Sequence, residues 1–174
     1  MTPRPDTTAR PLTEGERLAL SPGLWDALMA AGVKPQIRSR AHPAARIARL
    51  WLGATPVVAR PHLIHWPGAP ADLDRCDDSA RAVLQHEAQH LLDYATGAMS
   101  ALRYLTRPRD WRYGYQLTAG CRWGDFGCEQ RASIAEHLWL LEHGRQDLVR
   151  DSLGRDPAPI AAYRRLIPWA ATRP

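Results

Sequence analysis

The sequence predicts a mostly helical α+β domain with a small antiparallel sheet. Apolar residues at helical spacing predict two strong helices, over residues 79–96 and 128–143. Residues 55–68 contain two short β-rich runs around Pro61 and then a turn signal, which predicts a strand at the edge of a sheet. A chain of 174 residues suits one domain, and we expect it to span residues 12–174.

The other elements are shorter. Residues 1–11 are rich in Pro, Thr and Arg, which predicts a disordered tail. Residues 12–32 predict one or two short helices, because Thr13 and Glu16 have the spacing of a capping box. Three further segments complete the prediction: a strand over 34–42, a helix or a strand over 45–54, and a short last helix over 158–170.

Composition excludes several classes of protein. No apolar run approaches the roughly 20 residues of a membrane span, and the first residues carry no apolar signal segment. We therefore expect a cytoplasmic protein without membrane contact, with signal-independent export left open. The net charge is +5, but the arginines are scattered and Lys34 is the only lysine, so we expect no nucleic-acid partner. Three cysteines without a C-x-x-C pair exclude a four-cysteine zinc module.

The helix predicted over 79–96 carries His86-Glu87-Ala88-Gln89-His90, the pattern H-E-x-x-H. Residues four apart lie on one face of a helix, so both imidazoles can reach one metal ion. The intervening Glu87 would lie beside that metal, where a carboxylate can take a proton from water without being a ligand. The alternative is an ordinary helix that happens to carry two histidines, each with other hydrogen-bond partners.

A catalytic zinc site needs a third ligand, and the helix predicted over 128–143 offers candidates. Glu129, Glu136 and His143 recur every seven residues and share one face of that helix. Spacing alone leaves the choice among them open. Glu129 also suits the helix dipole, and Glu136 also suits a role in orienting a ligand histidine through a hydrogen bond. Cys128 is a minor alternative ligand.

Four segments occur in an order that resembles a known family: "RPLTEGE" near the start, "HEAQH", "YGYQL" at 113–117 and "GCEQRASIAE" at 127–136. Together they resemble the small bacterial vgr-related proteins, which are zincin-like. More loosely, the last segment is similar to zinc peptidases whose third ligand lies in an E-x-x-A pattern on a later helix. The sequence departs from the family pattern at Asp93, where a glutamine is usual, and at Arg131 and Ser133.

The resemblance implies a minimal zincin-like metallopeptidase fold and a Zn²⁺ site made by His86, His90 and Glu129. It implies hydrolysis of a peptide or protein substrate with Glu87 as general base, either of peptides in general or of one partner protein. The rival hypothesis is a non-catalytic accessory or binding protein linked to a contractile, type VI-like secretion system. A fourth coordination position closed by Cys128 or His143 would favour that rival.

Three further residues are candidates for supporting roles. Tyr113 and Tyr115 lie between the two strong helices, and either could stabilise a developing oxyanion. Each is also typical of a half-buried strand tyrosine. Asp93 follows His90 by three residues, so it could orient a ligand histidine, cap a loop or pair with Arg103.

Overall fold

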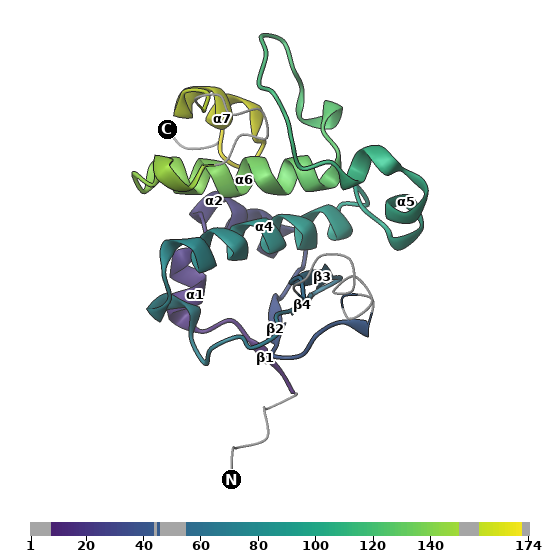
Figure 1. The fold of residues 1–174 in the computed structure, drawn as a ribbon, viewed down its shortest axis with the longest axis vertical. Coiled ribbons are helices and arrows are strands. Elements are labelled where there is room, and N and C mark those ends of the chain that lie inside the picture. The colour runs from purple at the N-terminus through teal and green to yellow at the C-terminus, as the bar shows by residue number, and fades with distance from the viewer. Residues whose placement is uncertain (1–7, 44, 46–54, 150–156, 172–174) are drawn as a thin grey trace.

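The computed structural model describes residues 8–43, 45, 55–149 and 157–171. Two long helices, α4 and α6, run side by side through its centre (Figure 1). The sheet lies against α4 on the face away from α6, and α7 covers the other side of α6. The helices are α1 (Glu14–Ala19), α2 (Pro22–Ala30), α4 (Asp78–Ala95), α5 (Ala101–Thr106), α6 (Cys128–Glu142) and α7 (Ile160–Leu166).

The sheet has four strands in the order β1-β2-β4-β3: β1 (Ala9–Pro11), β2 (Gln36–Arg38), β3 (Val58–Arg60) and β4 (Leu63–His65). Strand β2 pairs in parallel with β4, whereas the β1–β2 and β3–β4 pairs are antiparallel. The prediction of an antiparallel sheet was therefore wrong, and the sheet is mixed. The chain returns to the sheet after β2 by way of β3, so β4 enters beside β2 in the same direction.

The segment around Pro61 forms a tight hairpin rather than one long strand. Pro61 and His62 make the turn between β3 and β4, and His62 takes the left-handed conformation with φ of 64°. The edge of the sheet is formed by strand β3, which precedes Pro61 and packs against α4.

The predicted helices are confirmed to within a residue or two, except that α7 is shorter than expected. Asp77 caps α4 by accepting the Ala80 N–H at 2.9 Å. The capping box of Thr13 and Glu16 begins α1 as predicted, and α2 begins separately at Pro22.

The N-terminal prediction needs a correction. Residues 9–11 form β1 instead of continuing a disordered tail, because they pair with β2 and Arg10 binds Glu16 with two N–O contacts of 2.7 Å. Residues 1–7 and almost all of 45–54 lie outside the described residues. Within the described ranges, no helix has the length and apolarity that crossing a membrane requires.

One hydrophobic core joins these layers. Buried Leu84, Ala88 and Leu91 of α4 meet Ile134 and Leu138 of α6. The same cluster includes side chains from α2 and from the central strands of the sheet: Leu24, Leu28, Ile37 and Ile64. Helices α4 and α6 are thus fixed against each other by apolar contacts, which holds the polar side chains between them in register.

Candidate metal centre

The packing of α4 on α6 brings three of the predicted metal ligands together. His86 and His90 project from the middle of α4, and Glu129 lies in the first turn of α6. All three are buried, and one donor atom from each lies within 4.8 Å of the others. The structure therefore brings Glu129 beside His86 and His90, which lie 43 and 39 positions before it in the chain.

The spacing of the donor atoms matches a small coordination shell. Glu129 Oε2 lies 3.3 Å from His86 Nε2 and 3.2 Å from His90 Nε2. A tetrahedral zinc ion with bonds of roughly 2.0–2.2 Å holds its ligand atoms roughly 3.3 Å apart. Two imidazole nitrogens and one carboxylate oxygen at these separations could hold a metal ion after only small side-chain movements.

Hydrogen bonds from outside the cluster orient two of these residues. Glu136 Oε2 accepts from His86 Nδ1 at 3.0 Å, which leaves Nε2 directed at Glu129. This is the orienting role that one interpretation of Glu136 predicted. The Tyr104 hydroxyl donates to Glu129 Oε1 at 3.0 Å, so that Oε2 is the oxygen that faces both histidines.

Tyr104 is a residue that the sequence did not predict. It belongs to α5, in the connection between α4 and α6. Its contact with Glu129 depends on how α5 docks beside the start of α6. No spacing in the sequence reports that docking.

Two buried polar atoms at the centre lack a partner. Within the described part of the chain, neither Glu87 Oε2 nor His90 Nδ1 has a hydrogen-bond partner. Glu87 is 5% exposed and lines the same cavity as the three predicted ligands. A buried carboxylate oxygen without a donor is costly for stability, and such atoms concentrate at functional sites.

Burial and hydrogen bonding shift the pKa values of His86 and Glu129 in opposite directions. Burial opposes the charged form of His86, but its hydrogen bonds to Glu129 and Glu136 outweigh burial and raise its pKa to about 10. Burial likewise opposes the charged form of Glu129, yet the bonds from His86 and His90 hold its pKa well below the usual range. Glu129 is therefore a carboxylate at neutral pH and is ready to bind a cation.

The pKa values of Glu87 and of two nearby tyrosines are raised. Burial raises the pKa of Glu87, and the imidazoles of His90 and His86 offset that rise only in part. Burial, reinforced by the Glu129 carboxylate, also raises the pKa values of Tyr104 and Tyr113. Both phenols therefore keep their protons and act as hydrogen-bond donors at neutral pH.

The cluster opens into a cavity of about 330 Å³, which lies at the lower end of the range for ligand-binding pockets. Edge strand β3, α4, α5 and Tyr113 enclose it. Its lining is mostly apolar, with the polar groups gathered at the cluster: Ala45, Pro56, Val57, Val58, Ala59, Arg60, His86, Glu87, His90, Tyr94, Met99, Ala101, Tyr104, Leu105, Tyr113 and Glu129.

The structure separates the two predicted tyrosines. The Tyr113 ring stacks on His86 with centroids 6.0 Å apart, so Tyr113 stands beside the cluster. Tyr115 points elsewhere, and its hydroxyl lies 2.5 Å from His137 Nδ1 and 3.1 Å from the Tyr163 hydroxyl. Tyr115 therefore joins α6 to α7 and is not among the residues that line the cavity, so this geometry gives no support to a catalytic role for it.

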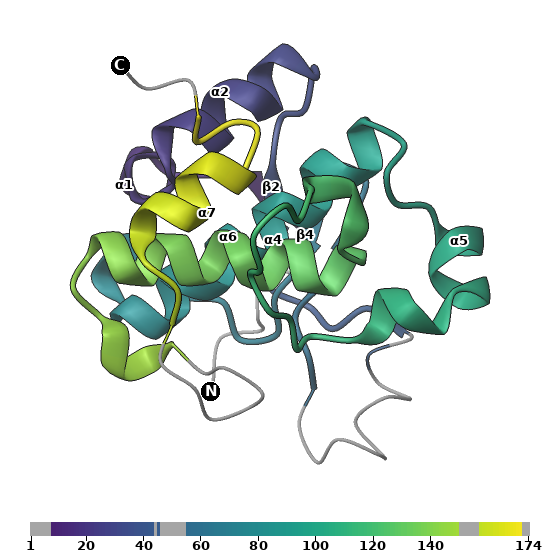
Figure 2. The same cartoon turned by 90° about the horizontal axis from the view of Figure 1, so that it is seen from above.

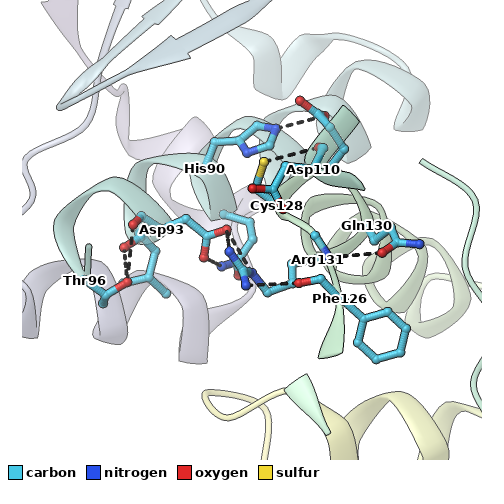
Figure 3. Close-up of polar contacts among 12 residues, drawn as sticks. His90, Asp93, Thr96, Asp110, Phe126, Cys128, Gln130 and Arg131 are labelled. Atoms are coloured by element: carbon cyan, nitrogen blue, oxygen red, sulfur yellow. Dashed lines mark hydrogen bonds and ion pairs between the residues drawn. The ribbon is translucent and has the colours of Figure 1, made fainter. Parts of the chain in front are cut away.

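Asp93 also departs from its predicted role of orienting a ligand histidine. Its carboxylate accepts from Arg131 Nε at 3.0 Å and Nη2 at 2.9 Å, and from Gln89 at 2.9 Å (Figure 3). Asp93 and Arg131 are two of the departures from the family pattern, and they face each other as a buried ion pair. This pair joins α4 to α6 one helical turn beyond His90.

The remaining candidates for a metal ligand are engaged elsewhere. Cys128 Sγ donates to the Asp110 carbonyl at 3.4 Å, and burial raises its pKa to about 12 (Figure 3). His143 stacks on Trp139 and donates to its carbonyl at 2.7 Å. Neither is close enough to complete the donor group that contains Glu129. Geometry thus favours Glu129 over Glu136, His143 and Cys128 as the third ligand.

Comparison with models of protein families, with curated proteins and with solved structures finds no match to this chain. The resemblance to vgr-related proteins therefore stays a hypothesis. The case for function depends on the geometry of the centre itself.

Proposed function

We propose that this protein is a zinc-dependent peptidase, with His86, His90 and Glu129 as metal ligands and Glu87 as general base. The observation that carries the proposal is the position of Glu129 Oε2, 3.3 Å and 3.2 Å from the two histidine Nε2 atoms at the edge of a cavity. Two histidines and one glutamate form the donor set of known catalytic zinc sites, which leave a fourth position open.

The residues suit peptide hydrolysis. A zinc ion bound here would lower the pKa of water to about 7 and polarise the carbonyl of a peptide bond. Glu87 would take the proton of the attacking water at Oε2 and deliver it to the leaving amine nitrogen. Its raised pKa supports both steps, because a base whose pKa lies nearer to neutral accepts and returns a proton more readily.

The two tyrosines at the centre divide the supporting roles. Tyr104 is held by its hydrogen bond to Glu129 Oε1 and positions that ligand. Tyr113 stacks on His86 and lines the cavity, and its hydroxyl also hydrogen-bonds Glu129, so it is a protonated donor beside the proposed metal position. We assign Tyr113 the stabilisation of the oxyanion.

The test is hydrolysis of unfolded casein and of a broad peptide library by the zinc-loaded protein. We expect cleavage that stops on chelation and returns with zinc. Glu87→Gln should lower kcat/KM about 100-fold to 10,000-fold, because general-base catalysis contributes that much. The matched control is Glu14→Gln, a change at an exposed glutamate of α1, which should cleave like the wild type.

Three outcomes would contradict the peptidase proposal. Equal cleavage by the wild type and Glu87→Gln would remove Glu87 from the reaction. A protein that binds zinc but cleaves neither casein nor any library peptide would favour the accessory role. Iron in place of zinc would point away from hydrolysis, since the same donor set also serves iron-dependent oxygenases.

A further inference from the structure

The segment 101–113, which follows α4 and precedes α6, exposes an unusual amount of apolar surface. Four of the six exposed large hydrophobic side chains in the described ranges lie in it: Leu102 at 74%, Leu105 at 71%, Tyr113 at 58% and Trp111 at 47% exposed. Helix α5 itself buries no side chain completely and lies at the periphery of the molecule (Figure 2). Apolar surface gathered in this way marks a binding surface.

The same segment is positively charged toward solvent. Arg107, Arg109 and Arg112 are all exposed. The one acidic residue between 101 and 113 is Asp110, which is buried and lies 3.6 Å from Arg103 and 3.9 Å from Arg109. The Asp110 carboxylate is therefore paired within the protein, and the exposed surface of residues 101–113 is apolar and basic.

This surface is continuous with the candidate metal centre. Tyr104, Leu105 and Tyr113 belong to the segment and also line the cavity that contains Glu87 and Glu129. The indole of Trp111 donates to the Tyr104 carbonyl at 2.6 Å, which ties the basic part of the segment to the part that lines the cavity.

We propose that residues 101–113 bind the polypeptide substrate, selecting a stretch in which large apolar side chains are accompanied by Asp or Glu. This inference rests on the proposed function. A second copy of the chain is disfavoured as the occupant because each copy carries a net charge of +5. Trp111 and Tyr113 are exposed aromatic rings, but the two most exposed side chains of the segment, Leu102 and Leu105, offer no face on which a base could stack, which favours a polypeptide over nucleic acid.

The experiment probes an array of random 12-residue peptides with labelled Glu87→Gln protein, which should leave the peptides intact. A triple variant replaces Arg107, Arg109 and Arg112 by Gln. A matched control variant replaces three other exposed arginines by Gln, Arg75, Arg122 and Arg165, which lowers the net charge equally. Circular dichroism and zinc content verify that each protein is folded.

We expect the bound peptides to be enriched in Asp, Glu and large apolar residues. The triple variant should bind acidic peptides roughly tenfold more weakly, since it loses three exposed ion pairs, while the control variant keeps its affinity. Leu102→Ser with Leu105→Ser should weaken binding of all selected peptides without changing the preference for acidic ones.

Several results would overturn the inference. They are an absence of acidic enrichment, equal losses in the triple and control variants, no peptide bound at all, or binding to phosphatidylglycerol vesicles in place of peptides. The array reports binding without requiring a metal or a reaction. If the preference for acidic peptides persists in a protein that neither binds zinc nor cleaves peptides, the proposed function is contradicted and the binding surface is supported. If zinc-dependent cleavage occurs without that preference, the proposed function is supported and the binding surface is contradicted.

Discussion

Glu16 and Glu87 are both buried glutamates, but the protein treats them in opposite ways. Glu16 is 0% exposed and accepts hydrogen bonds from two nitrogens of Arg10, from the Thr13 N–H and from the Leu73 N–H. Burial would raise its pKa, but these donors together lower it. Glu87 is 5% exposed, its Oε2 has no partner among the described residues, and its pKa is raised.

This difference distinguishes a carboxylate that stabilises the fold from one that is available for a reaction. The donors around Glu16 join the N-cap of its own helix, the preceding strand β1 and the distant segment at Leu73. Glu87 accepts a single backbone hydrogen bond, from Ala59 of strand β3, and its other oxygen faces a cavity without a donor among the described residues. A buried charge left partly unsatisfied reduces stability, so its presence is best explained by a function that needs it.

The largest effect on folding should come from Glu16→Gln. The amide cannot accept both Arg10 contacts and the two backbone N–H groups as a carboxylate does. We expect the free energy of unfolding to fall by about 2–4 kcal/mol, as when one partner of a buried ion pair is removed. Urea unfolding measures the loss, and Glu14→Gln on the same helix is the control that should stay within about 0.5 kcal/mol of the wild type.

Tyr104→Phe should weaken metal binding without unfolding the protein. The hydroxyl fixes Glu129 by its bond to Oε1, and losing such an orienting contact typically weakens metal affinity about 10-fold to 100-fold. Competition with a zinc chelator measures the change. Tyr94→Phe removes a hydroxyl from the same cavity and should keep the wild-type affinity, and an equal loss in both variants would argue against a specific role for Tyr104.

Glu87→Gln should leave the fold as stable as the wild type or more stable, by up to about 1 kcal/mol, while activity is lost. The substitution removes a buried charge that burial disfavours and keeps the shape of the side chain. Urea unfolding compares it directly with Glu16→Gln. If the two variants lost similar stability, the contrast between the two glutamates would be wrong.

Acid pH should reveal the same contrast with a smaller effect. The pKa of Glu16 is lowered on folding, so its stabilisation is fully present above its unfolded pKa of about 4.3. That stabilisation is lost as the pH falls through the lower folded pKa. As the pH is lowered from 6, the free energy of unfolding should therefore fall less steeply for Glu16→Gln than for the wild type. The same pH dependence in both proteins would contradict this.

The local features of the fold could be predicted from the sequence, whereas the long-range ones could not. Apolar periodicity predicted α4 and α6, and the capping box predicted the start of α1. The parallel pairing of β2 with β4 was missed, because strand direction depends on the path of the chain between them. Strand β1 was missed because a strand of three residues that ends in proline has no recognisable sequence pattern.

The site divides in the same way. The spacing of His86, Glu87 and His90 on one helix is local, so the sequence could predict it. Helical spacing left Glu129, Glu136 and His143 equivalent, and only the resemblance chose among them. The contact of Tyr104 with Glu129 and that of Tyr115 with His137 could not be predicted, since both depend on how the segment between the two helices packs on α6.

The most direct test of the account is the metal content of the purified protein beside Glu87→Gln and His86→Ala, with the metal identified by mass spectrometry. We predict one zinc per chain in the wild type and in Glu87→Gln, and none in His86→Ala. That result would establish the ligand and leave Glu87 free for its reaction. A wild-type chain that binds no metal even after zinc is added would contradict the account, and "HEAQH" would then be a helix with two buried histidines.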